Sequence, residues 1–204
     1  MRTLLLILAL PSAVFTTAQE PRIGNDLSGT VSLGVRSGLS FFNDGDRKNV
    51  GQSVGGQFRV QIAPRVNTDW FLDLITAPTT NGSRRDLHIG WSVLYYLRRP
   101  SVAPPLLQPY VLAGHCFDHT SQFSDGDDAA QVEGWSGAVQ AGLGTHFNIT
   151  ERFDISPVLQ YMIHLGHEHE AEGGTTPIET EHGSHLEGHL LFTVSMNWKL
   201  FDAW

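Results

Sequence analysis

Apolar residues recur at every second position in eight segments of this chain, with small or polar residues between them. A period of two places alternate side chains on opposite faces of a β-strand, and no segment of useful length has the period of a helix. We therefore predict an all-β fold. Its eight strands are expected at residues 28–42, 53–63, 69–76, 86–97, 108–117, 134–147, 152–165 and 189–200.

One face of these strands is apolar and carries no charge, whereas the opposite face is polar. The polar face includes Arg36, Arg59, Asp73, His88, His146, Asp154, His164, Asn197 and Lys199. Segment 108–117 is ambiguous because neither of its faces is clearly polar, so its orientation stays open.

Alternation alone does not say which face lies inside. A lipocalin-like soluble barrel turns the apolar face inward, and a membrane barrel turns it toward lipid. Three features favour the membrane barrel. Links at 42–53, 77–86, 117–131 and 166–188 are longer and more polar than those between them, aromatic residues cluster near the strand ends, and the chain ends in the aromatic sequence NWKLFDAW.

These features, with the stretch GLGTHFNITERFDISPVLQYMIHL, resemble the small eight-stranded outer-membrane barrels of the OmpA/OmpX/OmpW-like group. The resemblance covers nearly all of the chain after its first residues. It implies an antiparallel up-and-down transmembrane β-barrel with short periplasmic turns and longer external loops, located in the outer membrane of a Gram-negative bacterium. Outer-membrane lipid and the barrel assembly machinery are the implied partners, and we expect a monomer.

The start of the chain predicts export. Arg2 precedes an apolar run that is too short to span a bilayer, and small residues follow it, as in a secretory signal peptide. We predict a signal peptide at residues 1–18 and a barrel domain at 19–204. The formal net charge of −8 argues against nucleic acid as a partner, and a single cysteine, Cys116, allows no internal disulfide.

Charged residues on the polar face predict a cluster inside the barrel. Counting from the turns places Arg36 opposite Arg59, with Asp73 on the next strand, and two confined cations need acids beside them. The interior of an eight-stranded barrel is narrow enough for side chains to fill it. The cluster is thus either a stabilising network or part of a gated ion path.

Histidines predict a second site. Six of the ten histidines lie between His164 and His189, and if Phe153 faces Leu200, then His164 and His189 are cross-strand partners on the inner face. With His185 they would form a metal site at the rim for zinc, copper or nickel. The alternatives are weak adventitious binding, or neutral histidines hydrogen-bonded within the lumen. No other cofactor is expected.

Three functions remain open at this point. The first is a non-enzymatic barrel with a structural, adhesive or surface-binding role through its external loops. The second is a narrow porin-like conduit for ions or small solutes. The third is a lipid A-modifying enzyme, for which His182 and Ser184 are the candidate base and nucleophile.

Overall fold

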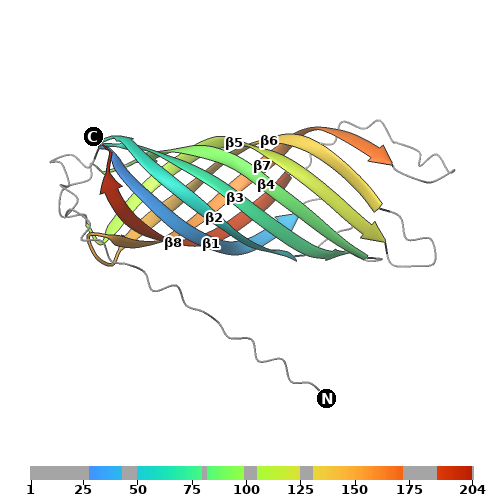
Figure 1. Cartoon of the computed structure of the whole chain (residues 1–204), viewed down its shortest axis with the longest axis horizontal. Coiled ribbons are helices and arrows are strands. Elements are labelled where there is room, and N and C mark those ends of the chain that lie inside the picture. The colour runs from blue at the N-terminus through green and yellow to red at the C-terminus, as the bar shows by residue number, and fades with distance from the viewer. Residues whose placement is uncertain are drawn as a thin grey trace, which may run out of the picture.

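The chain forms a closed barrel of eight antiparallel strands (Figure 1). The structure is a computed structural model that describes residues 28–42, 50–79, 82–98, 105–124, 131–171 and 188–203. No helix among these residues is long and apolar enough to cross a membrane. The strands are β1 (Thr30–Phe42), β2 (Val50–Ala63), β3 (Val66–Thr79), β4 (Gly82–Tyr96), β5 (Leu107–Ser124), β6 (Gln131–Asn148), β7 (Phe153–Ala171) and β8 (Gly188–Asp202).

Each strand pairs with its sequence neighbours, and β1 pairs with β8 to close the ring. This confirms the predicted eight-stranded up-and-down fold. The start of β1 and the end of β8 meet at one end of the barrel, which we call the terminal end, where Thr30 Oγ1 donates a hydrogen bond of 2.8 Å to Asp202 Oδ1. The opposite end, which carries the links after β1, β3, β5 and β7, is called the loop end (Figure 1).

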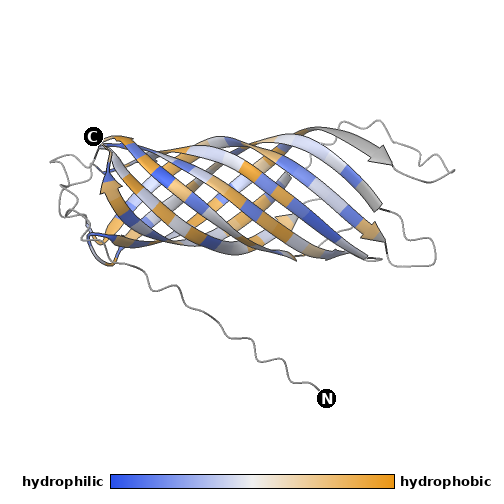
Figure 2. Ribbon diagram, viewed as in Figure 1, coloured by the Kyte–Doolittle hydropathy of each residue, from blue (hydrophilic) through white to orange (hydrophobic). Residues whose placement is uncertain are grey.

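Side chains along the strands alternate between the outside and the lumen, and in Figure 2 apolar and polar positions accordingly alternate along the ribbons. The outside is apolar: Leu33, Val54 and Trp198 expose 56%, 63% and 47% of their surface, and many other large apolar residues share this orientation. The lumen holds most of the buried polar and charged side chains. An apolar surface of this extent around a polar interior is the arrangement of a barrel whose solvent is lipid.

The orientation of β5, which the sequence left open, is resolved by the structure. Tyr110, Leu112, Cys116 and Asp118 face the lumen, while Phe117 is 57% exposed on the outside. Two apolar groups therefore lie among the polar residues of the lumen. One comprises Phe71, Ile75, Cys116, Ala138, Met162 and Leu191, and the other Leu94, Tyr96, Tyr110, Leu112 and Val158.

Two of the expected long loops prove to be largely strand. β3 continues to Thr79 and β4 begins at Gly82, so the expected loop at 77–86 is wrong: most of it forms a ladder that includes the pair Pro78–Ser83. The expected loop at 117–131 likewise contributes residues to both β5 and β6. These polar residues continue the strand pairing because the strands extend beyond the part of the barrel whose outer surface is apolar. There, neither face of a strand needs apolar side chains.

Candidate functional site

Buried arginine and aspartate side chains gather in the lumen between β1, β2, β3 and β7. We call this set the Arg/Asp cluster, and its members are Arg36, Arg59, Asp69, Asp73 and Asp154. Arg36 Nε lies 3.1 Å from Asp73 Oδ1. Asp69 links the two cations, because its carboxylate oxygens lie 3.8 Å from Arg36 Nη1 and 3.5 Å from Arg59 Nε. Each charge thus faces an opposite charge inside the barrel.

Asp154 anchors the other side of Arg59. Its Oδ1 atom lies 3.3 Å from Arg59 Nη1 and accepts hydrogen bonds of 2.6 Å from Ser156 Oγ and 2.9 Å from Asn197 Nδ2. His146 Nδ1 lies 3.6 Å from the same oxygen. The cluster is thereby tied to β6, β7 and β8, so that its contacts cross the lumen from one side of the barrel to the other.

The register of the cluster differs from the prediction. Arg36 pairs with Gly55 and Arg59 pairs with Ser32, so the expectation that Arg36 lies opposite Arg59 is wrong. Gly55 also pairs with Asp73 on its other side. Because Gly55 has no side chain, Arg36 on β1 reaches Asp73 on β3 across the strand between them. Sequence parity placed these three charged residues in the lumen, but it did not single out Asp69, the carboxylate that links the arginines.

Together these contacts fill the lumen near the terminal end. A cavity of about 20 Å³ remains beside Arg59, Tyr96, His146 and Asp154, and a void of that size holds about one water molecule. Tyr96 and Tyr110 pack edge-on with ring centroids 6.1 Å apart, and Tyr110 lies 4.6 Å from the His146 ring. This packed polar core matches the interior expected of an eight-stranded barrel.

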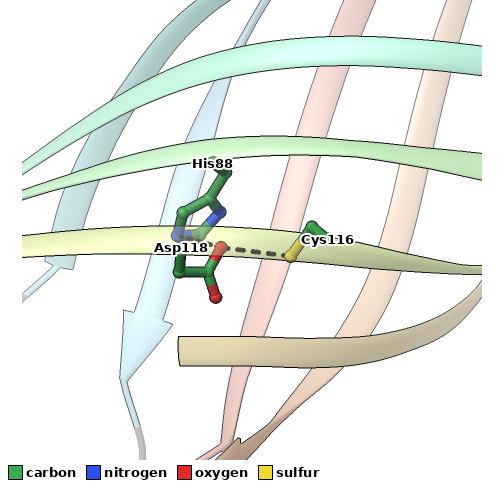
Figure 3. Close-up of side chains that lie close together, drawn as sticks. All are labelled: His88, Cys116 and Asp118. Carbon is green, nitrogen blue, oxygen red and sulfur yellow. Dashed lines mark hydrogen bonds and ion pairs between the residues drawn. The ribbon is translucent and has the colours of Figure 1, made fainter. Parts of the chain in front are cut away.

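A second set of buried side chains lies nearer the loop end. We call it the histidine cluster, and it consists of His88 on β4, Cys116 and Asp118 on β5, Met162 and His164 on β7, and His189 on β8, all of them buried. Figure 3 shows His88 pointing toward Asp118 and Cys116 from the neighbouring strand. The ligand atoms of these three residues all lie within 4.8 Å of one another.

Short contacts connect the members of the histidine cluster. Asp118 Oδ2 lies 3.0 Å from His164 Nδ1, and Asp118 Oδ1 lies 3.5 Å from His88 Nε2. Cys116 Sγ donates a hydrogen bond of 3.1 Å to Asp118 Oδ1 and lies 3.5 Å from Met162 Sδ. Met162 Sδ in turn lies 3.2 Å from His189 Nε2. The cluster thus combines imidazole, thiol, thioether and carboxylate groups.

Strand pairing explains how the histidine cluster forms. His88 and Asp118 are cross-strand partners on β4 and β5, and Met162 and His189 are cross-strand partners on β7 and β8. Between these pairs, β6 contributes Ser136, which pairs with Asp118 and whose Oγ lies 3.2 Å from His164 Nδ1, and the small residue Ala138, which pairs with Cys116 on one side and His164 on the other. The small residue leaves space for side chains from the flanking strands to approach one another.

Of the three metal ligands predicted from the sequence, two belong to the histidine cluster. His164 and His189 both face the lumen, with ring centroids 5.0 Å apart. They are not cross-strand partners, because Phe153 pairs with Trp198 and not with Leu200, so the predicted register is wrong by two residues. His185 and the proposed enzyme residues His182 and Ser184 lie outside the described residues.

Four members of the histidine cluster were not identified as ligands from the sequence. His88 carried a usable signal, since it lies on the polar face of its strand. Cys116 and Asp118 required the orientation of β5, which is fixed only by pairing with β4 and β6. Met162 required knowledge that apolar residues also enter this lumen.

No protein-family model matches the sequence, and no curated protein matches it. Solved structures do resemble the fold. Neisserial surface protein A (NspA) has a TM-score of 0.53 at 13% sequence identity, with 84% of this chain and 97% of that chain covered. The outer membrane protein OprG from Pseudomonas aeruginosa has a TM-score of 0.56 at 10% identity, with 85% and 97% covered. At such low identity the likeness concerns the fold.

Proposed function

We propose that this chain, which has the fold of the small outer-membrane barrels, is an integral protein of the outer membrane of a Gram-negative bacterium and acts at the cell surface. Its role is structural, adhesive or surface-binding, without enzymatic activity and without conduction of solutes. The barrel is surrounded by outer-membrane lipid, is inserted by the barrel assembly machinery and works as a monomer.

The observation that carries this proposal is the filled lumen. Arg36 and Arg59 lie across the lumen with their charges directed to Asp69, Asp73 and Asp154. Moving such groups aside would separate buried ion pairs, at a cost of about 3–5 kcal/mol for each one broken. A path for solutes would require that separation, so the lumen supports a closed barrel over the porin-like alternative.

The length of the strands that form the barrel wall supports a function at the cell surface. β5, β6 and β7 have 18, 18 and 19 residues, whereas about 9–11 residues suffice to cross a bilayer. Near the loop end Phe117 and Trp135 are exposed as an interfacial girdle would be. Beyond Phe117, β5 continues through His119, Thr120, Ser121 and Gln122, which are polar. The extension offers a rigid polar wall for contacts with other molecules.

Planar-bilayer recording tests the closed lumen. The parent protein should give no steady ion current. A triple variant, Arg36→Ala, Arg59→Ala and Asp69→Ala, removes the long side chains that cross the lumen and should conduct, which shows that the assay detects an open barrel. A steady current through the parent, similar to that of the triple variant, would contradict the proposal and favour the conduit.

A further inference from the structure

The six side chains of the histidine cluster have the chemistry of a transition-metal site. Imidazole and thiolate suit zinc and copper, while thioether sulfur selects copper(I). Cys116 and Met162 supply two sulfur atoms 3.5 Å apart, and His189 Nε2 lies 3.2 Å from the second of them. From this donor set we propose that the lumen binds one copper(I) ion between β5, β7 and β8, with Cys116, Met162 and His189 as ligands and His88 or Asp118 completing the shell.

The distances within the cluster fit a shared ion. Ligand atoms that lie about 2.0–2.3 Å from one tetrahedral ion are roughly 3.3–3.8 Å from each other. In the structure, successive donor atoms from His88 through Asp118, Cys116 and Met162 to His189 are separated by 3.5, 3.1, 3.5 and 3.2 Å. The His88 and His189 rings stack with centroids 5.5 Å apart. Small rotations of these side chains would bring the donors around one centre.

Charge inside the cluster favours a cation. Asp69, Asp73 and Asp154 contact arginine, and Asp86 pairs with Arg84 at 2.9 Å. By contrast, no arginine or lysine of the described chain lies within ion-pairing distance of Asp118, which is fully buried and contacts His88, His164 and Cys116. A buried carboxylate is costly without a compensating positive charge, and a bound cation supplies one.

Position in the barrel also favours metal binding. The ladder between β7 and β8 ends at the pair Ile163–Gly188, directly beside the Met162–His189 pair. The Arg/Asp cluster fills the lumen toward the terminal end, so an ion reaches the histidine cluster from the loop end. Binding forms a copper–sulfur bond at Cys116 Sγ and releases the thiol proton to solvent. Copper stays in the same oxidation state throughout.

The test is titration of the detergent-folded protein with copper(I), under reducing conditions and in competition with a chromophoric copper(I) chelator. The parent should bind one ion per chain. Cys116→Ser and Met162→Leu should each weaken binding by a factor at least as large as the roughly 10- to 100-fold seen when supporting groups are lost. Met162→Leu is close in volume, so it changes the donor while keeping the packing.

The matched control is His119→Asn. His119 lies on β5, three positions from Cys116, and its ring packs on Trp135 with ring centroids 4.7 Å apart. The substitution therefore removes a histidine of β5 that does not belong to the histidine cluster. This variant should bind copper(I) as the parent does. Gel mobility of unheated samples reports whether each variant is folded. X-ray absorption of the copper-loaded parent should show sulfur atoms bound to copper, and the copper-loaded Met162→Leu variant should show fewer of them.

Three results would overturn the proposal. The parent fails to bind a stoichiometric copper(I) ion, folded Cys116→Ser and Met162→Leu bind it as tightly as the parent, or zinc binds in a 1:1 complex that copper(I) does not displace. The first would leave the cluster as a set of hydrogen-bonded histidines, and the last would assign a zinc site without thioether ligation. None of these results depends on whether the lumen conducts.

Discussion

At the scale of single residues, the absence of a side chain at Gly55 is as important to the Arg/Asp cluster as the charges themselves. Gly55 is the cross-strand partner of both Arg36 and Asp73. A Cβ atom built at this glycine would overlap Asp73 Oδ1 and the backbone carbonyl of Leu72. Gly114 has the same role between Ser92 and Gln140, whose side chains are joined by a hydrogen bond of 2.8 Å.

Gly55→Ala should therefore destabilise the barrel. Its methyl group must displace the Asp73 carboxylate or the β3 backbone, and overpacking of this kind costs about 1–3 kcal/mol. The adjacent Gly56 is the matched control, because a Cβ there would meet only the Gly34 carbonyl oxygen, at 3.7 Å. Gly56→Ala should stay within about 0.5 kcal/mol of the parent. Urea unfolding in lipid vesicles measures both, and equal effects of the two substitutions would contradict this packing.

Asp73→Ala should lower the free energy of unfolding by about 3 kcal/mol, the lower end of the range for breaking a buried ion pair. The loss falls at the lower end because Asp69 still faces Arg36 at 3.8 Å. Asp73→Asn keeps the shape and removes the charge, so most of the loss should remain in that variant. An unchanged urea midpoint for both variants would show that Arg36 does not depend on Asp73.

Except for β5, the strand faces that enter the lumen could be predicted from the sequence, whereas the cross-strand partners of their residues could not. Parity along one strand is a local property and is enough to direct Arg36, Arg59 and Asp73 inward. Partners depend on register across strands, and register depends on where each link begins and ends. The error at Phe153, which pairs with Trp198, therefore moved the expected partner of His189 from Met162 to His164.

At the scale of elements, β5, β6 and β7 extend beyond the length that a bilayer requires. In the extension both faces of β5 are polar, from Asp118 to Gln122, and alternation of apolar with polar residues disappears. That alternation is imposed by lipid on one side, so its loss marks the level where the wall leaves the membrane. The same loss made residues 117–131 resemble a loop in the sequence, although residues 117–124 belong to β5 and Gln131 begins β6.

If the loop end faces the outside of the cell, a cysteine in this extension should react with a membrane-impermeant maleimide in intact cells. Ser121→Cys lies in the extension, and Arg65→Cys, at the link between β2 and β3, lies at the terminal end. We expect labelling of Ser121→Cys in intact cells, and labelling of Arg65→Cys only after the membrane is permeabilised.

The native Cys116 is fully buried, so the parent serves as the unlabelled control. The reverse pattern, with Arg65→Cys reactive in intact cells and Ser121→Cys protected, would show that the barrel is inserted in the opposite orientation.

At the scale of the whole molecule, a single arrangement accounts for the outer and inner surfaces together. Lipid takes the place of a hydrophobic core on the outside, and ion pairs, hydrogen bonds and two apolar groups fill the inside. Closure of β1 on β8 completes the ring of strand pairs among the described residues. The alternating pattern predicted the strands, but it predicted this architecture only together with the link lengths, the aromatic residues near the strand ends and at the end of the chain, and the resemblance to small outer-membrane barrels. It did not predict the histidine cluster, which gathers residues from four strands and depends on all the registers between them.

Fractionation of cells that express the full chain tests the membrane barrel most directly. The apolar outer surface requires lipid or detergent, so the protein should remain with the outer-membrane fraction after extraction with alkaline carbonate. It should also migrate differently on gels with and without heating, because the closed barrel resists the detergent until it is heated. Recovery of a folded, detergent-free, soluble monomer from the periplasm would contradict a lipid-facing apolar surface.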